Sequence, residues 1–132
     1  MPGTLDGIQV LLLDDDEDVL AILQMILESR GALVVLTSNA EAALAALTTM
    51  KVDVLVLDIT MPRRDGWWFL NEARSRGDLD GVPVLAVTGR NLNRDQIKNA
   101  GLNSYLQKPV DANTLCMTVE RLARARSPGS VS

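Results

Sequence analysis

Polar side chains capable of chemistry stand directly after four apolar runs of this sequence. Asp14 and Asp15 follow the first run, and Asp58 follows the third. Thr88 follows the fourth run, and Lys108 follows the fifth. If these runs are parallel strands of one sheet, their carboxyl ends meet at one edge. The sequence then brings three carboxylates, one hydroxyl and one ammonium group together from distant parts of the chain.

This set of groups suits phosphoryl transfer assisted by a metal ion. Three close carboxylates repel one another, and a hard divalent cation with oxygen ligands, Mg²⁺ or Mn²⁺, would offset that repulsion. An aspartate can also act as a nucleophile and form an aspartyl-phosphate. The metal and Lys108 would neutralise charge on the phosphoryl oxygens, which is most of what this reaction asks of a protein. Thr88 could donate its hydroxyl to one of those oxygens.

Each of these residues also has an ordinary structural interpretation. An aspartate after a strand often caps the next helix, and Asp16 is expected to be such a cap. A threonine at a strand end is commonly a turn residue, and a lysine before a proline is commonly a solvated loop charge. The hypothesis therefore rests on the joint placement of these residues at four strand ends.

The elements that position these groups alternate between short apolar runs and longer amphipathic stretches. The short runs are apolar nearly throughout, as in strands buried on both faces. Strict alternation of strand and helix predicts an α/β fold, a doubly wound five-stranded parallel sheet with helices on both faces. The expected strands are Ile8–Leu13, Leu33–Leu36, Val54–Leu57, Val82–Val87 and Ser104–Leu106, and the expected helices are Glu17–Ser29, Ser38–Met50, Trp67–Ser75, Arg94–Ala100 and Asp111–Ala125.

Local signals mark the ends of two of these helices. Gly31 supplies a stop for the first helix. Ser38 is a good N-cap for the second helix, and Glu41 three residues later would complete a capping box.

Length and composition limit the class of protein. The 132 residues suffice for one domain with an aliphatic core, which is assigned to residues 1–126. Ser127–Ser132 is expected to be a disordered tail or the start of a linker. A net charge of −4, from 17 acidic against 13 basic residues, argues against direct binding of nucleic acid.

Residue types that are rare or missing exclude further classes. The sequence has no histidine, which excludes His-based triads and His-ligated metals, and its single cysteine, Cys116, excludes an internal disulfide. No window approaches the roughly 20 apolar residues that span a bilayer, so no membrane insertion is expected. The N-terminus has no apolar signal-peptide core, and a cytoplasmic location is therefore expected.

Four separated blocks of the sequence contain the polar residues that follow the apolar runs: LLLDDDED at Leu11–Asp18, LDITMPRRDGWWFL at Leu57–Leu70, VLAVTGR at Val84–Arg90 and YLQKPVD at Tyr105–Asp111. These blocks resemble the signature motifs of bacterial response-regulator receiver domains, the phosphorylated modules of two-component systems. Their order and spacing fit this family over residues 7 to 125. The opening Leu5-Asp6-Gly7 also resembles receivers attached to hybrid kinases.

The resemblance implies a flavodoxin-like strand order of 2-1-3-4-5 and a role for each residue of the acidic cluster. Asp58 would be the phosphoacceptor. Asp15 and Asp58 would bind the metal ion directly, Asp14 would act mainly through water, and Thr60 would contribute its backbone carbonyl. Lys108 would contact the phosphoryl group.

Structural details follow from the same resemblance. The peptide bond before Pro109 would be cis. Gly66 would permit a tight start of the third helix after the loop MPRRDG. Adjacent helical positions point about 100° apart, so both tryptophans rarely enter one core. By their places in the motif, Trp67 would pack inward and Trp68 would lie largely in solvent.

Thr88 and Tyr105 would form the switch pair of the family. Phosphorylation of Asp58 would draw the Thr88 hydroxyl towards the new oxygens. Tyr105 would then turn from an outward, exposed position into the vacated space. The surface formed by the fourth helix, fifth strand and fifth helix would change as a result, so that the covalent event is read at a distance.

The resemblance also implies the partners. A sensor histidine kinase or a histidine phosphotransfer protein would donate the phosphoryl group, and a downstream output protein or domain would respond to it. The sequence leaves open whether the chain forms a homodimer. The chain would be a signalling domain of a phosphorelay rather than an enzyme, catalysing its own phosphorylation and dephosphorylation only.

Three alternatives predict different residues. A receiver-like module that binds proteins without phosphorylation predicts a missing acceptor, acid or lysine, whereas all are present. A flavodoxin-type ligand binder predicts a Ser/Thr/Gly-rich phosphate loop after the first strand, where the sequence is Asp-Asp-Asp-Glu-Asp. A haloacid-dehalogenase-type phosphatase predicts a second aspartate two residues after the first, as in Asp14 and Asp16, but its cap and further motifs do not fit in this length.

Overall fold

The computed structural model describes residues 4–61 and 65–125. Within these residues five parallel strands form one sheet in the order β2-β1-β3-β4-β5, which confirms the expected fold and strand order. The tail Ser127–Ser132 and residues 62–64 of the loop MPRRDG lie outside the described residues. The strands are β1 (Gln9–Leu13), β2 (Leu33–Thr37), β3 (Val54–Leu57), β4 (Val84–Thr88) and β5 (Ser104–Gln107).

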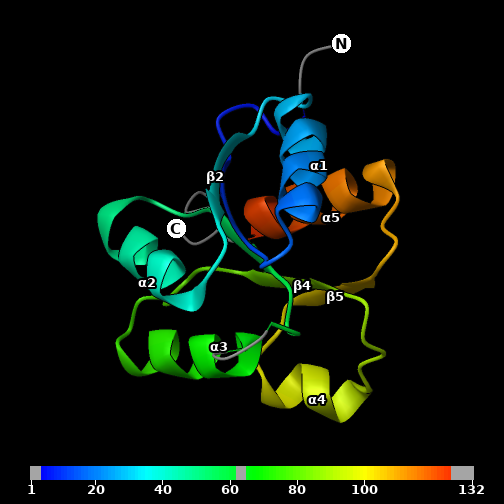
Figure 1. Cartoon of the computed structure of the whole chain (residues 1–132). Coiled ribbons are helices and arrows are strands. Elements are labelled where there is room, and N and C mark those ends of the chain that lie inside the picture. The colour runs from blue at the N-terminus through cyan, green and yellow to red at the C-terminus, as the bar shows by residue number, and fades with distance from the viewer. Residues whose placement is uncertain (1–3, 62–64, 126–132) are drawn as a thin grey trace.

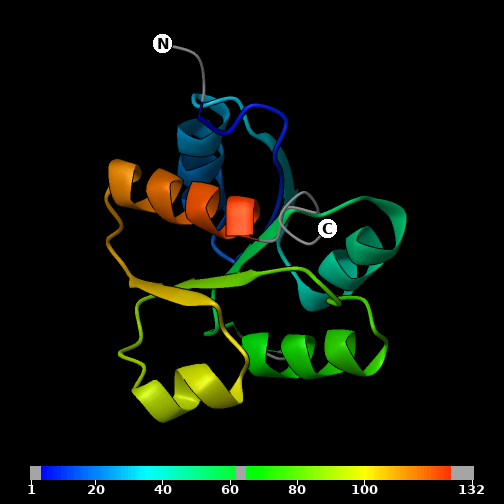
Figure 2. The ribbon, with the colours of Figure 1, turned by 180° about the vertical axis from the view of Figure 1, so that it is seen from behind.

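Helices cover both faces of the sheet (Figures 1 and 2). One face carries α1 and α5, and the other carries α2, α3 and α4. Because successive strand residues point to opposite faces, Leu11 and Leu13 pack towards α2 and α3, and Val10 and Leu12 pack towards α1 and α5. The helices are α1 (Glu17–Glu28), α2 (Ala40–Thr49), α3 (Gly66–Ser75), α4 (Arg94–Asn99) and α5 (Ala112–Ala125).

Burial differs between the central and the edge strands. All residues of β3 and β4 are buried, and in β1 only Gln9 is partly exposed. The expectation of strands buried on both faces is wrong for β2 and β5, where Leu33 is 56% exposed and no residue of Ser104–Gln107 is buried. An edge strand has one neighbour and lies at the margin of the helical layers, so its side chains are less covered.

The N-caps of α1 and α2 lie close to their expected positions. Asp16 caps α1, as expected, and its carboxylate accepts hydrogen bonds from the N–H groups of Asp18 and Val19. The expected cap of α2 is wrong by one residue. Asn39 has the extended backbone of a cap and accepts from the N–H of Ala42, so Ser38 does not cap this helix.

The capping box expected at Ser38 and Glu41 is therefore not formed. In a capping box, the side chain three residues after the N-cap accepts a hydrogen bond from the backbone of the cap. The third residue after Asn39 is Ala42, whose side chain has no acceptor. A capping box is present at Asn93 and Gln96, at the start of α4.

The two adjacent tryptophans of α3 are both half-buried. Trp67 packs against the core as expected, whereas the expectation that Trp68 lies largely in solvent is wrong. Below the sheet α3 lies between α2 and α4 (Figure 1). A helix with a neighbour on each side can cover two of its faces, so side chains about 100° apart can both find apolar contact.

Candidate functional site

Two aspartates stand at the carboxyl ends of the central strands. The N–H of Asp58 donates to the carbonyl of Leu13 at 2.9 Å, and the N–H of Asp14 donates to that of Thr37 at 3.2 Å. These bonds continue the strand ladders by one residue and fix both backbones. Asp14 and Asp58 are buried, with 3% and 7% of their surfaces exposed. Two carboxylates are thus held side by side by the rigid centre of the sheet.

Lys108 bridges the two buried carboxylates. Its ammonium group lies 2.9 Å from Oδ2 of Asp14 and 3.0 Å from Oδ2 of Asp58. Its backbone is fixed as well, because its N–H donates to the carbonyl of Thr88 at 2.9 Å. The peptide bond between Lys108 and Pro109 is cis, as expected. The lysine therefore joins the ends of three strands in one ionic cluster.

The other oxygen of each buried carboxylate accepts a backbone hydrogen bond. Oδ1 of Asp14 accepts from the N–H of Asp16 at 2.9 Å, and Oδ1 of Asp58 accepts from the N–H of Thr60 at 2.9 Å. Both carboxylates are therefore oriented as well as paired.

Burial and pairing act against each other in this cluster. Desolvation raises the pKa of Asp14 above its ordinary value, although hydrogen bonds from Lys108 and Asp16 oppose the shift. For Lys108 desolvation acts to lower the pKa, but hydrogen bonds to Asp14 and Asp58 outweigh it and raise the pKa. Lys108 hence stays charged, and the carboxylate of Asp14 would gain from further positive charge.

Asp15 completes the acidic cluster from the solvent side. Carboxylate oxygens of Asp14, Asp15 and Asp58 lie within 4.8 Å of one another, and Asp15 is exposed. Such a set of hard oxygen donors, open to water on one side, fits Mg²⁺, which keeps several waters when bound to proteins. Thr60 lies beside the cluster through its N–H bond to Asp58. A role for its carbonyl as a metal ligand stays a prediction.

Thr88 and Tyr105 do not contact the carboxylates through any hydrogen bond within the described residues. Thr88 is fully buried, and its Oγ1 accepts from the N–H of Arg90 at 3.3 Å. The Tyr105 hydroxyl donates to the carbonyl of Arg90 at 2.5 Å and accepts from the N–H of Leu92 at 3.2 Å. The expected outward, exposed Tyr105 is thus corrected, since these bonds to the β4–α4 loop hold its ring half-buried.

The backbone of Arg90 is the part of the site that sequence reasoning missed. Both residues of the expected switch pair bond to it, Thr88 through the N–H and Tyr105 through the carbonyl. Arg90 ends the motif VLAVTGR, but no sequence signal could have found these two backbone contacts, because every amino acid except proline offers the same two groups.

Gly66 lets α3 begin against the acceptor strand. A Cβ atom at this position would lie 2.7 Å from Cα of Ile59 and 2.9 Å from the carbonyl oxygen of Asp58. The N–H of Gly66 donates to the carbonyl of Ile59 at 2.9 Å. Close approach of two backbones, rather than an unusual backbone angle, therefore requires glycine here, which confirms the expected tight start of α3.

An apolar groove of about 440 Å³ borders the cluster at Lys108. Sequence reasoning missed it, although Val19, Ile22 and Ile26 recur at helical spacing on α1 and could have indicated a second apolar stripe. Ile22 is 52% exposed. The groove is lined by Val19, Ile22, Leu23, Ile26, Val87, Lys108, Pro109 and Val110.

None of the helices in the described residues is both long enough and apolar enough to cross a membrane.

Comparison with protein families supports the resemblance noted in the sequence. The family model of the response regulator receiver domain matches residues 10–120. An uncharacterised 14.6 kDa protein of Leptolyngbya boryana is 34% identical over 127 residues, which cover 95% of this chain and 97% of that protein. The response regulator MprA of Mycobacterium sp. strain KMS is 32% identical over 92% of this chain. The chain spans about half, 53%, of the length of MprA.

Solved structures agree with this match. The receiver domain of the Francisella response regulator 1452 superposes with a TM-score of 0.82 at 25% identity, covering 92% of this chain and all of that domain. The receiver domain of the sensor histidine kinase PA1611 from Pseudomonas aeruginosa gives 0.81 at 27% identity, covering 89% of this chain and 98% of that one. That structure has a magnesium ion coordinated in its active-site cleft.

Proposed function

Because this chain belongs to the family of response regulator receiver domains, we propose that it is a phosphorylation switch whose acceptor is Asp58. The switch comprises residues 1–126 and passes its signal to a downstream output protein or domain. One observation carries the proposal: the ammonium group of Lys108 lies within 3.0 Å of Asp58 and also pairs with Asp14, while Asp15 completes the acidic cluster.

The proposed reaction is transfer from a phosphohistidine of a kinase or phosphotransfer protein. An oxygen of Asp58 attacks phosphorus, the P–N bond breaks, and the imidazole nitrogen of the donor leaves with the electron pair of that bond. Oδ1 of Asp58 is already engaged with the N–H of Thr60, so Oδ2, which faces Lys108, is the proposed nucleophile. Lys108 then moves its hydrogen bond from Oδ2 to a phosphoryl oxygen, which keeps the new negative charge paired.

A divalent cation fits this cluster by the chemistry of its donors. Asp15 and Asp58 would hold Mg²⁺ directly, Asp14 would act through water, and the carbonyl of Thr60 would complete the protein ligands. When bound, the ion supplies positive charge that offsets repulsion among the carboxylates and the phosphoryl oxygens. Asp14 gains in the same way, since its burial disfavours the charged form.

Signal transmission is proposed to pass through the backbone of Arg90. A phosphoryl oxygen on Asp58 offers the Thr88 hydroxyl a charged acceptor, and Thr88 would rotate towards it. Rotation would break the bond that its Oγ1 accepts from the N–H of Arg90. The carbonyl of the same residue accepts from Tyr105, so a shift of this loop changes the burial of the tyrosine ring. The surface formed by α4, β5 and α5 then differs between the two states.

The apolar groove beside Lys108 supports docking of a protein donor. A phosphohistidine must reach Asp58 from the side on which the cluster is open, and the groove borders that side through Lys108 and Pro109. Ile22→Ala should slow transfer from the donor protein, because it removes an exposed apolar contact, but not transfer from acetyl phosphate, which needs no docking. Equal slowing of both reactions would contradict docking in the groove.

Intact-mass measurement tests the proposed function. Treatment with acetyl phosphate and Mg²⁺ should add one phosphoryl group to the parent chain and none to Asp58→Asn. As a matched control, Asp53→Asn changes an aspartate outside the acidic cluster and should still be labelled. Failure to label the parent would favour the alternative, a module that binds proteins without phosphorylation. Equal labelling of Asp58→Asn would move the acceptor to another residue.

A further inference from the structure

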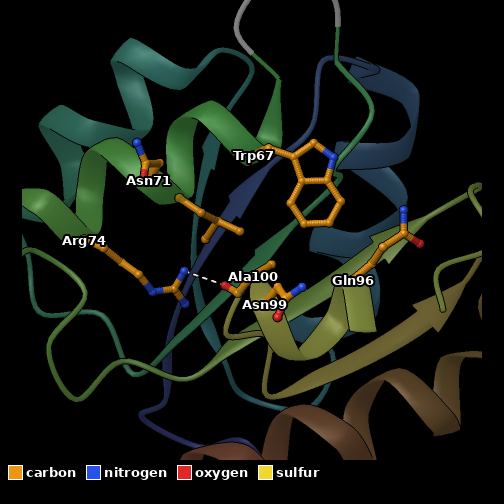
Figure 3. A pocket seen from close by; sticks show the side chains of 7 residues that line it. Trp67, Asn71, Arg74, Gln96, Asn99 and Ala100 are labelled. Atoms are coloured by element: carbon orange, nitrogen blue, oxygen red, sulfur yellow. Dashed lines mark hydrogen bonds between the residues drawn. The ribbon is translucent and has the colours of Figure 1, made fainter. Parts of the chain in front are cut away.

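The short helix α4 rests on the domain through few buried contacts. None of its six residues Arg94–Asn99 is buried, and Ile97 is half-buried against the core. Between α3 and α4 lies an open hollow of about 410 Å³, which Trp67 and Gln96 line from opposite sides (Figure 3). Side-chain packing alone therefore does not fix the distance between these two helices.

The two ends of α4 are held by their flanking segments, in which Leu92 and Leu102 are buried and hydrogen bonds from other elements reach the backbone. Before the helix, the hydroxyl of Tyr105 bonds to the backbone of Arg90 and Leu92. After it, the guanidinium group of Arg74 on α3 reaches across the hollow (Figure 3). Its Nη1 donates to the carbonyl of Ala100 at 2.5 Å, and its Nη2 donates to the carbonyl of Gly101 at 3.0 Å.

The contact of Arg74 is shaped for a guanidinium group. Two donors in a fixed plane meet two successive carbonyls, a geometry that a lysine ammonium cannot reproduce. Gly101 adopts φ +68°, and a Cβ atom there would lie 2.8 Å from Nη2 of Arg74. A side chain at residue 101 would therefore push the guanidinium away. The positive charge also lies at the negative end of the helix dipole.

We propose that Arg74 is a positioning residue for α4, holding its C-terminal end while Tyr105 holds the loop before its N-terminal end. The inference rests on the proposed function, in which the Arg90 loop moves after phosphorylation. With one end fixed by Arg74, a shift of that loop tilts α4 about its C-terminal end. Without Arg74, the C-terminal end loses its guanidinium contact while Tyr105 still holds the loop before the N-terminal end, and α4 samples more positions before Asp58 is phosphorylated.

Hydrogen exchange of the 132-residue chain measures the holding of this end directly. Suitable reporters are the amides of Ala100, Gly101 and Leu102, which donate to carbonyls of α4. Arg74→Gln should speed their exchange roughly three- to tenfold, because a charged hydrogen-bond donor to this end is lost. Arg74→Lys should restore part of the protection. The amide of Asp58 in the centre of the sheet should be unaffected.

Arg76→Gln is the matched control, because it removes an arginine at the end of the same helix that pairs only with Glu72 among the described residues. Exchange that rises equally in the two variants, or evenly across the whole sheet, would overturn the inference, as would unchanged exchange in Arg74→Gln. The hydrogen-exchange experiment uses the unphosphorylated chain, so its result does not depend on whether the proposed function is correct.

Phosphorylation supplies the second readout. Arg74→Gln should take up phosphate from acetyl phosphate within about twofold of the parent rate, because the cluster around Asp58 is untouched. Its exchange at Ala100, Gly101 and Leu102 should then change less on phosphorylation than that of the parent. A parent that takes up no phosphate contradicts the proposed function, whereas a parent and a variant with equal responses contradict the role of Arg74.

Discussion

Asp58 and α4 lie in one small domain, yet they are held by different kinds of contact. Asp58 ends a strand that is buried along its whole length, and its backbone and both carboxylate oxygens are bonded. In contrast, α4 itself has no buried residue. It is held through its flanks, where Leu92 and Leu102 are buried and where Tyr105 and Arg74 bond to the backbone.

The difference fits a division between chemistry and readout. Phosphoryl transfer needs groups held in fixed positions, which the centre of a sheet provides. Readout needs an element with more than one position of similar free energy, and regions with few buried apolar contacts are the ones that move. Changes in the central sheet and changes in α4 should therefore differ in their effects on stability and phosphorylation.

Truncation of apolar side chains should give the largest difference in stability between the core and α4. Phe69 of α3 is fully buried, so Phe69→Ala should lower the free energy of unfolding by about 3–5 kcal/mol. Ile97 of α4 is half-buried, and Ile97→Ala should cost clearly less, at most about 2 kcal/mol. Urea unfolding followed by fluorescence measures both. Similar losses in the two variants would contradict the loose seating of α4.

Gly66→Ala should be the next largest effect. The new Cβ would meet backbone atoms at 2.7 and 2.9 Å, so α3 must shift, at a cost of about 1–3 kcal/mol. Gly89→Ala is the control, because a Cβ there meets nothing within 4 Å. Gly66→Ala should also slow phosphorylation of Asp58, since one of the two backbone atoms that the Cβ would meet is the Asp58 carbonyl oxygen. A stable variant with the parent rate would contradict the close approach.

Addition of Mg²⁺ should stabilise the acidic end of the sheet. At a free concentration about ten times the Kd, binding to the folded chain adds about 1.4 kcal/mol and raises the Tm by several degrees. Asp15→Ala should abolish the rise, whereas Asp18→Ala, an acidic residue outside the cluster, should retain it. A melting curve that Mg²⁺ does not change in the parent would count against the metal site.

The cap of α2 gives the smallest expected effect. Asn39→Ala removes the side chain that accepts from the N–H of Ala42 and should cost about 1 kcal/mol. Ser38→Ala should cost a few tenths of a kcal/mol at most. Thermal unfolding measures both losses. A larger loss of stability in Ser38→Ala than in Asn39→Ala would indicate that Ser38 is the cap.

The sequence was sufficient to predict the fold and the grouping of the charged residues. Buried parallel strands are apolar throughout, and polar residues at their ends are conspicuous. Asp14, Asp58 and Lys108 could therefore be placed together from strand order alone. The sheet determines their positions, and the continuous apolar runs of its central strands are easily recognised in the sequence.

What the sequence did not predict depends on contacts between elements or on backbone groups. Ser38 and Asn39 are both good N-caps, and their difference lies in local backbone angles. Trp68 is covered because α3 has neighbours on both sides. Arg74 is an exposed arginine with no sequence signal, and its role depends on carbonyls that any residue would offer.

Comparison of NMR spectra with and without beryllofluoride, a mimic of the phosphoryl group, tests the central claim most directly. With Mg²⁺ present, the amide signals of Arg90, Leu92 and the residues of α4 should shift together with those near Tyr105, while the signals of α2 stay in place. Thr88→Ala should bind beryllofluoride but lose the shifts in α4. Shifts confined to residues around Asp58, or equal shifts in Thr88→Ala, would contradict a switch that passes from Asp58 through Arg90 to α4.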